Sequence, residues 1–264
     1  MKALIKLGGT LLDAPESRRG LAEEIARAAR DGLEAVIVHG GGKQMTRYLA
    51  DRGVESRFIN GLRVTTPEVL DAVLKVLAGS VNQELVAALV ACGAPAVGLS
   101  GMDALLTEAL PISDELGFVG KPVRSDPRLL HALIEFRYLP VLACVAGDRQ
   151  GNFFNVNADQ MAVSVASALQ VDKLLFLTDV DGVRGQDNQI RSTLSLDQCR
   201  DFIATGVASG GMRAKLESAV EALEAGISEV VIAPGASPDI VAKLLVGQAI
   251  GTRLVAPQGS LRHA

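Results

Sequence analysis

The chain has 264 residues, which suits one large domain or two closely joined lobes, and 48% of them are hydrophobic while 21% are charged. This composition excludes a mostly disordered chain, and a chain of this length can bury a core without a metal or disulfides. The net charge of −4 and an aromatic content of 3% argue against a nucleic-acid binder.

The first half of the chain alternates short apolar runs with segments of helical period. Strands are predicted over Ala3–Leu7 and Glu34–Val38, and helices over Glu16–Arg30 and Lys43–Arg52. Helical period returns over Pro67–Ala91, where we expect a break near Gly79.

The second half continues the same alternation. Further strands are predicted over Ala94–Leu99, Leu139–Val145, Lys173–Leu177, Glu229–Ile232 and Thr252–Val255, and helices over Pro127–Phe136, Ala158–Leu169, Met212–Ala225 and Pro238–Val246. Leu105–Val119 and Ala146–Phe154 lack helical period and are interpreted as hairpins inserted at a rim. The pattern predicts a mostly parallel sheet with helices on both faces, whose two lobes, 1–170 and 171–264, divide near residue 170.

The cysteines and the apolar segments indicate in which cellular compartment the protein is expected. Cys92, Cys144 and Cys199 are scattered and form no C-x-x-C pair, so neither a disulfide framework nor a zinc site is expected. Lys6 interrupts the apolar start of the chain, and the most apolar stretch, Val86–Leu99, is too short to span a bilayer. We therefore expect a soluble cytoplasmic protein.

Unusual residues follow several of the predicted strands. They are Gly8-Gly9, Gly40-Gly41-Gly42, Ser100-Gly101 and Thr178-Asp179. The carboxyl ends of parallel strands share one edge of a sheet, and open α/β sheets bind ligands at that edge. This convergence predicts a binding site there.

The run from His39 to Lys43 joins a strand to a helix through three glycines. Glycines allow close backbone approach to a ligand, and a helix N-terminus offers free N–H groups to an anion. The alternative is a plain tight turn, in which His39 is a packed residue. The spacing fits neither a P-loop nor a dinucleotide fingerprint.

Two lysines stand where cations are unexpected. Lys6 lies inside a buried strand and needs an anion near the strand end, unless it extends to the rim. Lys215 lies in the first turn of its predicted helix, just after Gly210-Gly211, where a cation opposes the helix dipole unless it is simply solvated. Both positions favour a phosphate site.

Two further segments have competing interpretations. Asn157 is a good N-cap with Gln160 at capping-box spacing, so Asp159 either belongs to that helix start or orients the two lysines. Arg63, in the polar segment from Asn60 to Thr65, either grips a carboxylate with its planar fork or lies on the surface.

Seven segments, taken in chain order, together resemble the N-acetylglutamate kinases of the amino acid kinase superfamily. They are Lys6-Leu7-Gly8-Gly9, His39-Gly40-Gly41-Gly42, Asn60-Gly61-Leu62-Arg63-Val64-Thr65, Asn155-Val156-Asn157-Ala158-Asp159, Thr178-Asp179-Val180, Gly210-Gly211-Met212 with Lys215, and Gly251-Thr252-Arg253. The first two belong to the wider superfamily, whereas the third and fourth are the specific pair. The resemblance implies a three-layer α/β/α sandwich on one mostly parallel eight-stranded sheet.

The resemblance also implies a reaction. The N-terminal lobe would hold N-acetyl-L-glutamate and form a homodimer, and the C-terminal lobe would hold MgATP, whose γ-phosphoryl group passes to the side-chain carboxylate in arginine biosynthesis. Lys6 and Lys215 would stabilise the transition state, and Asp159 would organise them. A carboxylate nucleophile is already ionised at pH 7, so no general base is needed, and Mg²⁺ is expected on the nucleotide phosphates rather than on protein ligands.

The remaining implied roles divide between the two substrates. Gly9, Gly41 and Gly42 would donate N–H groups to the transferring phosphoryl. Arg63 would bind the α-carboxylate of the amino-acid substrate, with Asn155 and Asn157 nearby. Residues expected to border ATP are Gly8, Thr178, Asp179, Val180, Asp181, Gly210, Met212 and Lys215, within the segments 178–181 and 206–212.

The sequence departs from the family pattern in two places, and two other functions are possible. Arg213-Ala214 differs from the family's usual residues and leaves the helix start open. Arginine-inhibited hexameric members carry an extra N-terminal helix, and the chain starts two residues before its first strand, so we expect a dimer insensitive to arginine. The alternatives are a sister kinase for another carboxylate and a nucleotide-binding sensor without activity.

Overall fold

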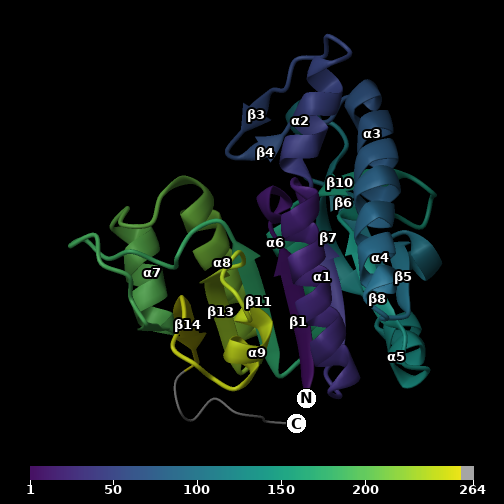
Figure 1. Cartoon of the computed structure of the whole chain (residues 1–264). Coiled ribbons are helices and arrows are strands. Elements are labelled where there is room, and N and C mark those ends of the chain that lie inside the picture. The colour runs from purple at the N-terminus through teal and green to yellow at the C-terminus, as the bar shows by residue number, and fades with distance from the viewer. Residues whose placement is uncertain (257–264) are drawn as a thin grey trace.

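One eight-stranded sheet runs through the computed structural model, which describes residues 1–256 (Figure 1). Its strands, in spatial order, are β12 (Thr193–Ser195), β14 (Thr252–Val255), β13 (Glu229–Pro234), β11 (Lys173–Thr178), β1 (Lys2–Leu7), β2 (Glu34–His39), β8 (Leu139–Ala143) and β5 (Ala96–Ser100). Six strands are parallel, while β14 is antiparallel to β13 and parallel to β12. The predicted mostly parallel eight-stranded sheet is confirmed.

Helices cover both faces of this sheet. One core lies beneath α1 (Pro15–Arg30), α2 (Gly42–Ala50), α3 (Pro67–Val73), α4 (Asn82–Ala91) and α9 (Ile240–Leu245). The other lies beneath α5 (Arg128–Glu135), α6 (Ala158–Leu169), α7 (Leu196–Ala204) and α8 (Gly210–Glu224). Alternate residues of β1 enter the two cores, Ile5 in the first and Leu4 in the second, as a strand period of two requires. The predicted three-layer α/β/α sandwich is therefore confirmed.

The segment Pro67–Ala91 is a continuous helix. A π-helical stretch, η2 (Leu74–Val81), joins α3 to α4, so the break expected near Gly79 is wrong. The wider helical turn accommodates the glycine without ending the helix. This helix is long and apolar enough to cross a membrane by length and composition, but Val73, Leu85 and other side chains of it lie in the first core, as in helices of many globular proteins.

The two predicted hairpins do form, and they close into one small barrel. Its strands are β6 (Thr107–Pro111), β7 (Val119–Ser125), β9 (Val145–Gly147) and β10 (Phe153–Val156). The antiparallel pairs are β6 with β7 and β9 with β10, and parallel pairing of β7 with β10 joins them. Barrel closure depends on this long-range pairing, which no local sequence pattern indicates. Because β10 runs directly into α6, the barrel fixes where that helix begins.

Several short elements lie outside the prediction. They are the hairpin β3 (Phe58–Ile59) and β4 (Leu62–Arg63), strand β12, helix α7, and the 3₁₀ turns η1 (Gly9–Leu12), η3 (Asp103–Leu105) and η4 (Asp114–Leu116). The predicted division near residue 170 falls in the turn between α6 and β11, and the sheet continues across it through the pairing of β1 with β11. The two lobes therefore share a backbone ladder, and their separate roles stay a prediction.

Candidate active site

Lys6, Asp159 and Lys215 meet at the carboxyl edge of the sheet. Nζ of Lys6 lies 2.7 Å from Oδ1 of Asp159, and Nζ of Lys215 lies 3.3 Å from Oδ2 of the same carboxylate. The side chains of Lys6 and Asp159 are each 7% exposed and that of Lys215 is 17% exposed. Residues from three distant parts of the chain thus form one nearly dry charge cluster with a net charge of +1.

The strand period explains why these residues meet. Lys6 is two residues beyond Leu4, so its side chain leaves β1 on the face that α6 and α8 cover. Asp159 lies in the first turn of α6 and Lys215 in the second turn of α8. The sequence pattern placed Lys215 in the first turn, and that prediction is wrong because α8 begins at Gly210 rather than Met212.

Opposing effects act on the carboxyl group of Asp159. Burial raises its pKa, and the two ammonium groups, Lys6 first and then Lys215, lower it, so that the pKa lies below its ordinary value. The carboxylate is ionised throughout the neutral range. Asp159 is therefore more than a helix-start residue, whereas Asn157 is the N-cap and accepts the N–H groups of Asp159 and Gln160 at 2.9 and 3.2 Å.

Two glycine loops pack against each other beside this cluster. A Cβ at Gly9 would lie 3.0 Å from the amide nitrogen of Gly42 and 3.1 Å from the backbone of Gly41, a spacing that leaves no room for a side chain. Gly8 donates its N–H to the carbonyl of Leu177 at 2.9 Å, which ties the first loop to β11. The chain thus brings bare backbone from β1 and β2 together, as an anion site requires.

His39 and Asn82 form a buried pair behind the second glycine loop. Nδ1 of His39 lies 3.0 Å from the carbonyl oxygen of Gly40, and its Nε2 lies 3.0 Å from Nδ2 of Asn82, which also donates to the carbonyl of Val141 at 2.9 Å. A carbonyl only accepts, so Nδ1 carries the proton and Nε2 accepts from the amide. Burial lowers the pKa of His39 to about 4, so the ring is neutral.

Asn82 is a residue that the sequence analysis missed. It is 1% exposed, and a Cβ on Gly98 of β5 would collide with its Oδ1. The signal was a lone asparagine within a long apolar helix, where an unpaired amide would be costly. Its contact with His39 supports the interpretation of His39 as a packed residue rather than a catalyst.

A cavity of about 170 Å³ adjoins the second glycine loop. It brings together the five residues predicted for the amino-acid substrate, with Cys144 also in its wall; those five are Gly41, Gly42, Arg63, Asn155 and Asn157. Burial raises the pKa of Cys144 to about 12, and its thiol donates to the carbonyl of His39 at 2.9 Å. The thiol is therefore uncharged and contributes packing to the cavity wall.

Arg63 is half-buried and well held in this cavity. Its guanidinium donates to Thr46 Oγ1 at 2.8 Å, to the carbonyl of Gly42 at 3.2 Å and to Ser56 Oγ, and it lies over the ring of Phe58, 4.7 Å from the centroid. Burial lowers the pKa of its guanidinium. Because the ordinary pKa of arginine is very high, the group stays charged at neutral pH. No carboxylate pairs with Arg63 within residues 1–256, so its charge is available to an anionic ligand.

The residues predicted to border the nucleotide are less closely gathered. Thr178 ends β11, and Asp179 next to it accepts a hydrogen bond from Thr10 at 3.3 Å. Val180 and Asp181 lie in an exposed turn. Gly210 and Met212 begin α8, whose first turn receives no side-chain cap. The structure thus places these residues along one edge of the sheet, where Val180 and Asp181 are exposed.

One capping detail differs from the sequence pattern. Gln160 has the spacing of a capping box, yet within the described chain its Oε1 accepts no hydrogen bond, and the helix start relies on Asn157 alone. The capping box forms instead at α7, where Ser195 and Gln198 bond reciprocally.

The sequence matches a known protein family over most of its length. Residues 1–234 match the model of the amino acid kinase family. The acetylglutamate kinase of Solibacter usitatus is 57% identical over 97% of this chain and 99% of its own length, and that of Acidobacterium capsulatum is 45% identical over 92% and 95%.

A solved structure extends the comparison to the fold. The N-acetylglutamate synthase from Neisseria gonorrhoeae, complexed with coenzyme A and N-acetyl-glutamate, superposes with a TM-score of 0.86 at 28% identity. The match covers 100% of this chain and 60% of that one, so this chain spans about three fifths of the length of the synthase.

Proposed function

The chain belongs to the amino acid kinase family, and from that premise we propose that it phosphorylates the side-chain carboxylate of N-acetyl-L-glutamate with ATP. The products are N-acetyl-L-glutamyl 5-phosphate and ADP, a step of arginine biosynthesis. The observation that carries the proposal is Asp159 held between Lys6 and Lys215 beside two bare glycine loops. Relatives named acetylglutamate kinase, matched over nearly their full length, support it.

Phosphoryl transfer here needs charge neutralisation and in-line positioning. An oxygen of the substrate carboxylate attacks the γ-phosphorus as the bond to the bridging oxygen of ADP breaks, and no proton moves. Lys6 and Lys215 would neutralise the charge that spreads over the transferring oxygens, while the amides of Gly9 and Gly42 would donate to them. Asp159 is a positioning residue, because its carboxylate holds both ammonium groups in place.

The amino-acid substrate fits the cavity around Arg63. N-Acetyl-L-glutamate carries an α-carboxylate for the guanidinium and an acetamide for Asn155 or Asn157. Asn155 already donates to Thr65 Oγ1 at 3.0 Å, which orients its amide within the cavity wall. Free glutamate has an ammonium group in place of the acetamide, so Asn155 and Asn157 would lose the amide group that they are placed to bind, and a second cation would enter the cavity that holds Arg63.

ATP is the second substrate, and we infer that it brings Mg²⁺ on its phosphates. Both oxygens of Asp159 are committed to lysines, and no cluster of three metal-ligating side chains occurs among residues 1–256. The lysine pair instead fits a multiply charged phosphate group. Thr178, Asp179 and the start of α8 would border the nucleotide, and Mg²⁺ would supply charge neutralisation at its phosphates.

The substrate assignment is tested by coupled ADP release with N-acetyl-L-glutamate, L-glutamate and L-2-aminoadipate side by side. We expect the highest kcat/KM with N-acetyl-L-glutamate and loss of turnover in Lys6→Ala. A higher kcat/KM for either competitor would assign the protein to a sister kinase. Nucleotide binding without ADP release from any of the three would favour the sensor alternative.

We also propose a cytoplasmic homodimer, following the family resemblance. Light scattering of the purified protein should give twice the mass of the 27.6 kDa chain. A monomer or a hexamer would contradict this part of the proposal and leave the substrate assignment untouched.

A further inference from the structure

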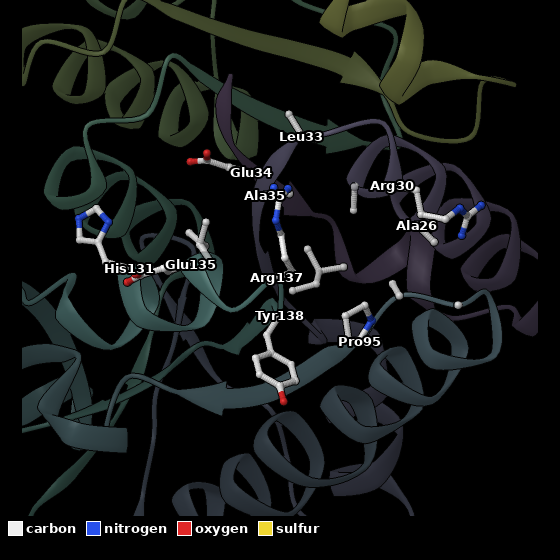
Figure 2. Close-up of a pocket in the computed structure, with 15 residues that line it drawn as sticks. Ala26, Arg30, Leu33, Glu34, Ala35, Pro95, His131, Glu135, Arg137 and Tyr138 are labelled. Atoms are coloured by element: carbon white, nitrogen blue, oxygen red, sulfur yellow. The ribbon is translucent and has the colours of Figure 1, made fainter.

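A cavity of about 680 Å³ lies at the opposite edge of the sheet from the charge cluster. It is bounded by the end of α1, the starts of β2 and β8, the turn before β5, and α5 (Figure 2). Pairing of β2 with β8 begins only at Ile37 and Val141, although β2 pairs with β1 from Glu34 onward. Toward their amino ends the two strands are thus not paired with each other, and the cavity opens between them.

Arg137 occupies an unusual backbone position at this cavity. It follows α5 with φ of +63°, its N–H donates to Ile134 O at 2.9 Å, and the N–H of Tyr138 donates to Leu133 O at 2.8 Å. This is the Schellman end of a helix, where glycine is favoured because its left-handed residue carries no Cβ. Six helices of the described chain are followed by a glycine with positive φ, namely Gly32, Gly53, Gly93, Gly206, Gly226 and Gly247. An arginine here accepts strain, and strained residues concentrate at binding sites.

The charges of the cavity are not paired with one another. Figure 2 shows the Arg137 guanidinium in the middle, with His131, Glu34 and Glu135 on one side and Arg30 on the other. Arg30 already donates to the carbonyl of Cys92 at 2.7 Å. Within residues 1–256 the guanidinium of Arg137 and the carboxylates of Glu34 and Glu135 form no ion pair. Glu34, Glu135 and Arg137 are exposed at the cavity, and both signs of charge face one space without an ion pair between them.

We propose that this cavity binds a small zwitterion of the amino-acid class. Its carboxylate pairs with Arg137, whose planar fork suits that group, and its ammonium group pairs with Glu34 or Glu135. The apolar wall formed by Ala26 and Pro95 faces the ligand's side chain. The site is separate from the phosphoryl-transfer edge, and the proposal does not depend on the substrate assigned there.

The test screens the common L-amino acids, glutamate excepted, at about 5 mM against the full chain by saturation-transfer NMR, followed by calorimetry. We expect at least one to bind, and expect its amide and its N-acetyl derivative, which each lack one charge, to bind more weakly. Arg137→Gly should weaken binding about tenfold or more, since an ionic hydrogen-bonded pair is lost. The same variant should keep or raise the melting temperature, because glycine relieves the positive φ.

A matched control comes from the end of α6. Gln170 has φ of +50° in the same kind of helix end, away from this cavity, so Gln170→Gly should also keep or raise the melting temperature but leave amino-acid binding unchanged. The proposal is overturned if no amino acid binds the wild-type protein at that concentration. It is equally overturned if Arg137→Gly binds as the wild type does, or if it changes only the oligomeric state in light scattering, which would mean that a second copy covers the cavity.

Discussion

The two halves of the sheet's carboxyl edge differ in how far their side chains are already held. Around β2, Arg63 donates three hydrogen bonds, Asn155 and Asn157 are bonded, and His39 and Asn82 lie buried beneath the glycine loop. Around β11, Val180 is 39% exposed and Asp181 forms an exposed ion pair with Arg184 at 3.4 Å. The half around β2, where we propose that the amino acid binds, thus has its polar side chains held by hydrogen bonds, whereas the half around β11, proposed for the nucleotide, is more exposed.

Asp159 connects the two halves. Lys6 belongs to β1 and Lys215 to α8, and they contact the same carboxylate. Because the half around Arg63 is held by hydrogen bonds and is joined to the more exposed half by one charge cluster, we expect substitutions in the two places to change different kinetic constants. Substitutions around Arg63 should act on amino-acid binding, whereas substitutions at the cluster should act on the chemical step.

The largest effects are expected for the two lysines. Lys6→Ala and Lys215→Ala should each lower kcat about 10²–10³-fold, because each removes a preorganised donor from a nearly dry site. Both KM values should change far less, since the loss is confined to the transition state. Steady-state kinetics with N-acetyl-L-glutamate and ATP measure this, with Lys75→Ala, an exposed lysine paired only with Asp71, as the control. Equal losses in KM would show that the lysines act in substrate binding instead.

Asp159→Asn tests whether one charge holds both lysines. We expect kcat to fall to the range of the lysine variants, and Gln160→Ala, in the same helical turn, to stay near wild type. The variant also leaves two nearly buried ammonium groups unpaired, so its melting temperature should fall and should recover when phosphate ions are added. A kcat close to wild type would reduce Asp159 to a structural residue, because Asn suits a helix start about as well as Asp.

Arg63→Lys probes the amino-acid half alone. The substitution keeps the charge but loses the planar fork, so KM for N-acetyl-L-glutamate should rise about tenfold while KM for ATP stays within about twofold. Kinetics that vary each substrate in turn provide the measurement. If both constants rise together, the guanidinium supports the fold of the glycine loop through Gly42 and Thr46 rather than contacting the substrate.

Local patterns were sufficient to predict most of the sheet. β1, β2, β11, β13 and β14 lie within two residues of their predicted bounds, and α6 matches its prediction, because apolar alternation and the Asn157 cap are local signals. The sequence analysis did not predict β12, α7 or the closure of the two hairpins into a barrel. Barrel closure depends on the pairing of β7 with β10, in which Val119 lies opposite Asn155, 36 positions later, and such long-range pairing leaves no signal in the local sequence.

The candidate site divides in the same way. Lys6 was recognisable from the sequence as a cation inside an apolar strand. The glycine runs were recognisable as loops whose backbone can lie close to a ligand. That Lys6 and Lys215 share Asp159 follows from the face on which β1 presents its even residues and from the packing of α6 and α8. The contact between Asn82 and His39 links residues 43 positions apart, so only the fold reveals it.

The smallest predicted effect concerns His39 and the pH dependence of stability. Its pKa is about 4 in the folded protein and about 6.5 when unfolded, so above pH 6.5 the ring is neutral in both states and contributes no pH dependence. Between pH 6.5 and 4 the unfolded state binds a proton that the folded state excludes, and the free energy of unfolding falls as the pH falls. At about 1.4 kcal/mol per pH unit, the loss reaches about 2 kcal/mol at pH 5.

Denaturant titrations from pH 8 to 5 should show this loss in wild type and a shallower decline in His39→Gln, which keeps a buried amide but cannot titrate. Because carboxylates titrate alike in both proteins, the difference between the two curves isolates the imidazole. Parallel curves would mean that His39 becomes charged within the fold, and that the neutral ring donating to Gly40 is not what holds the glycine loop.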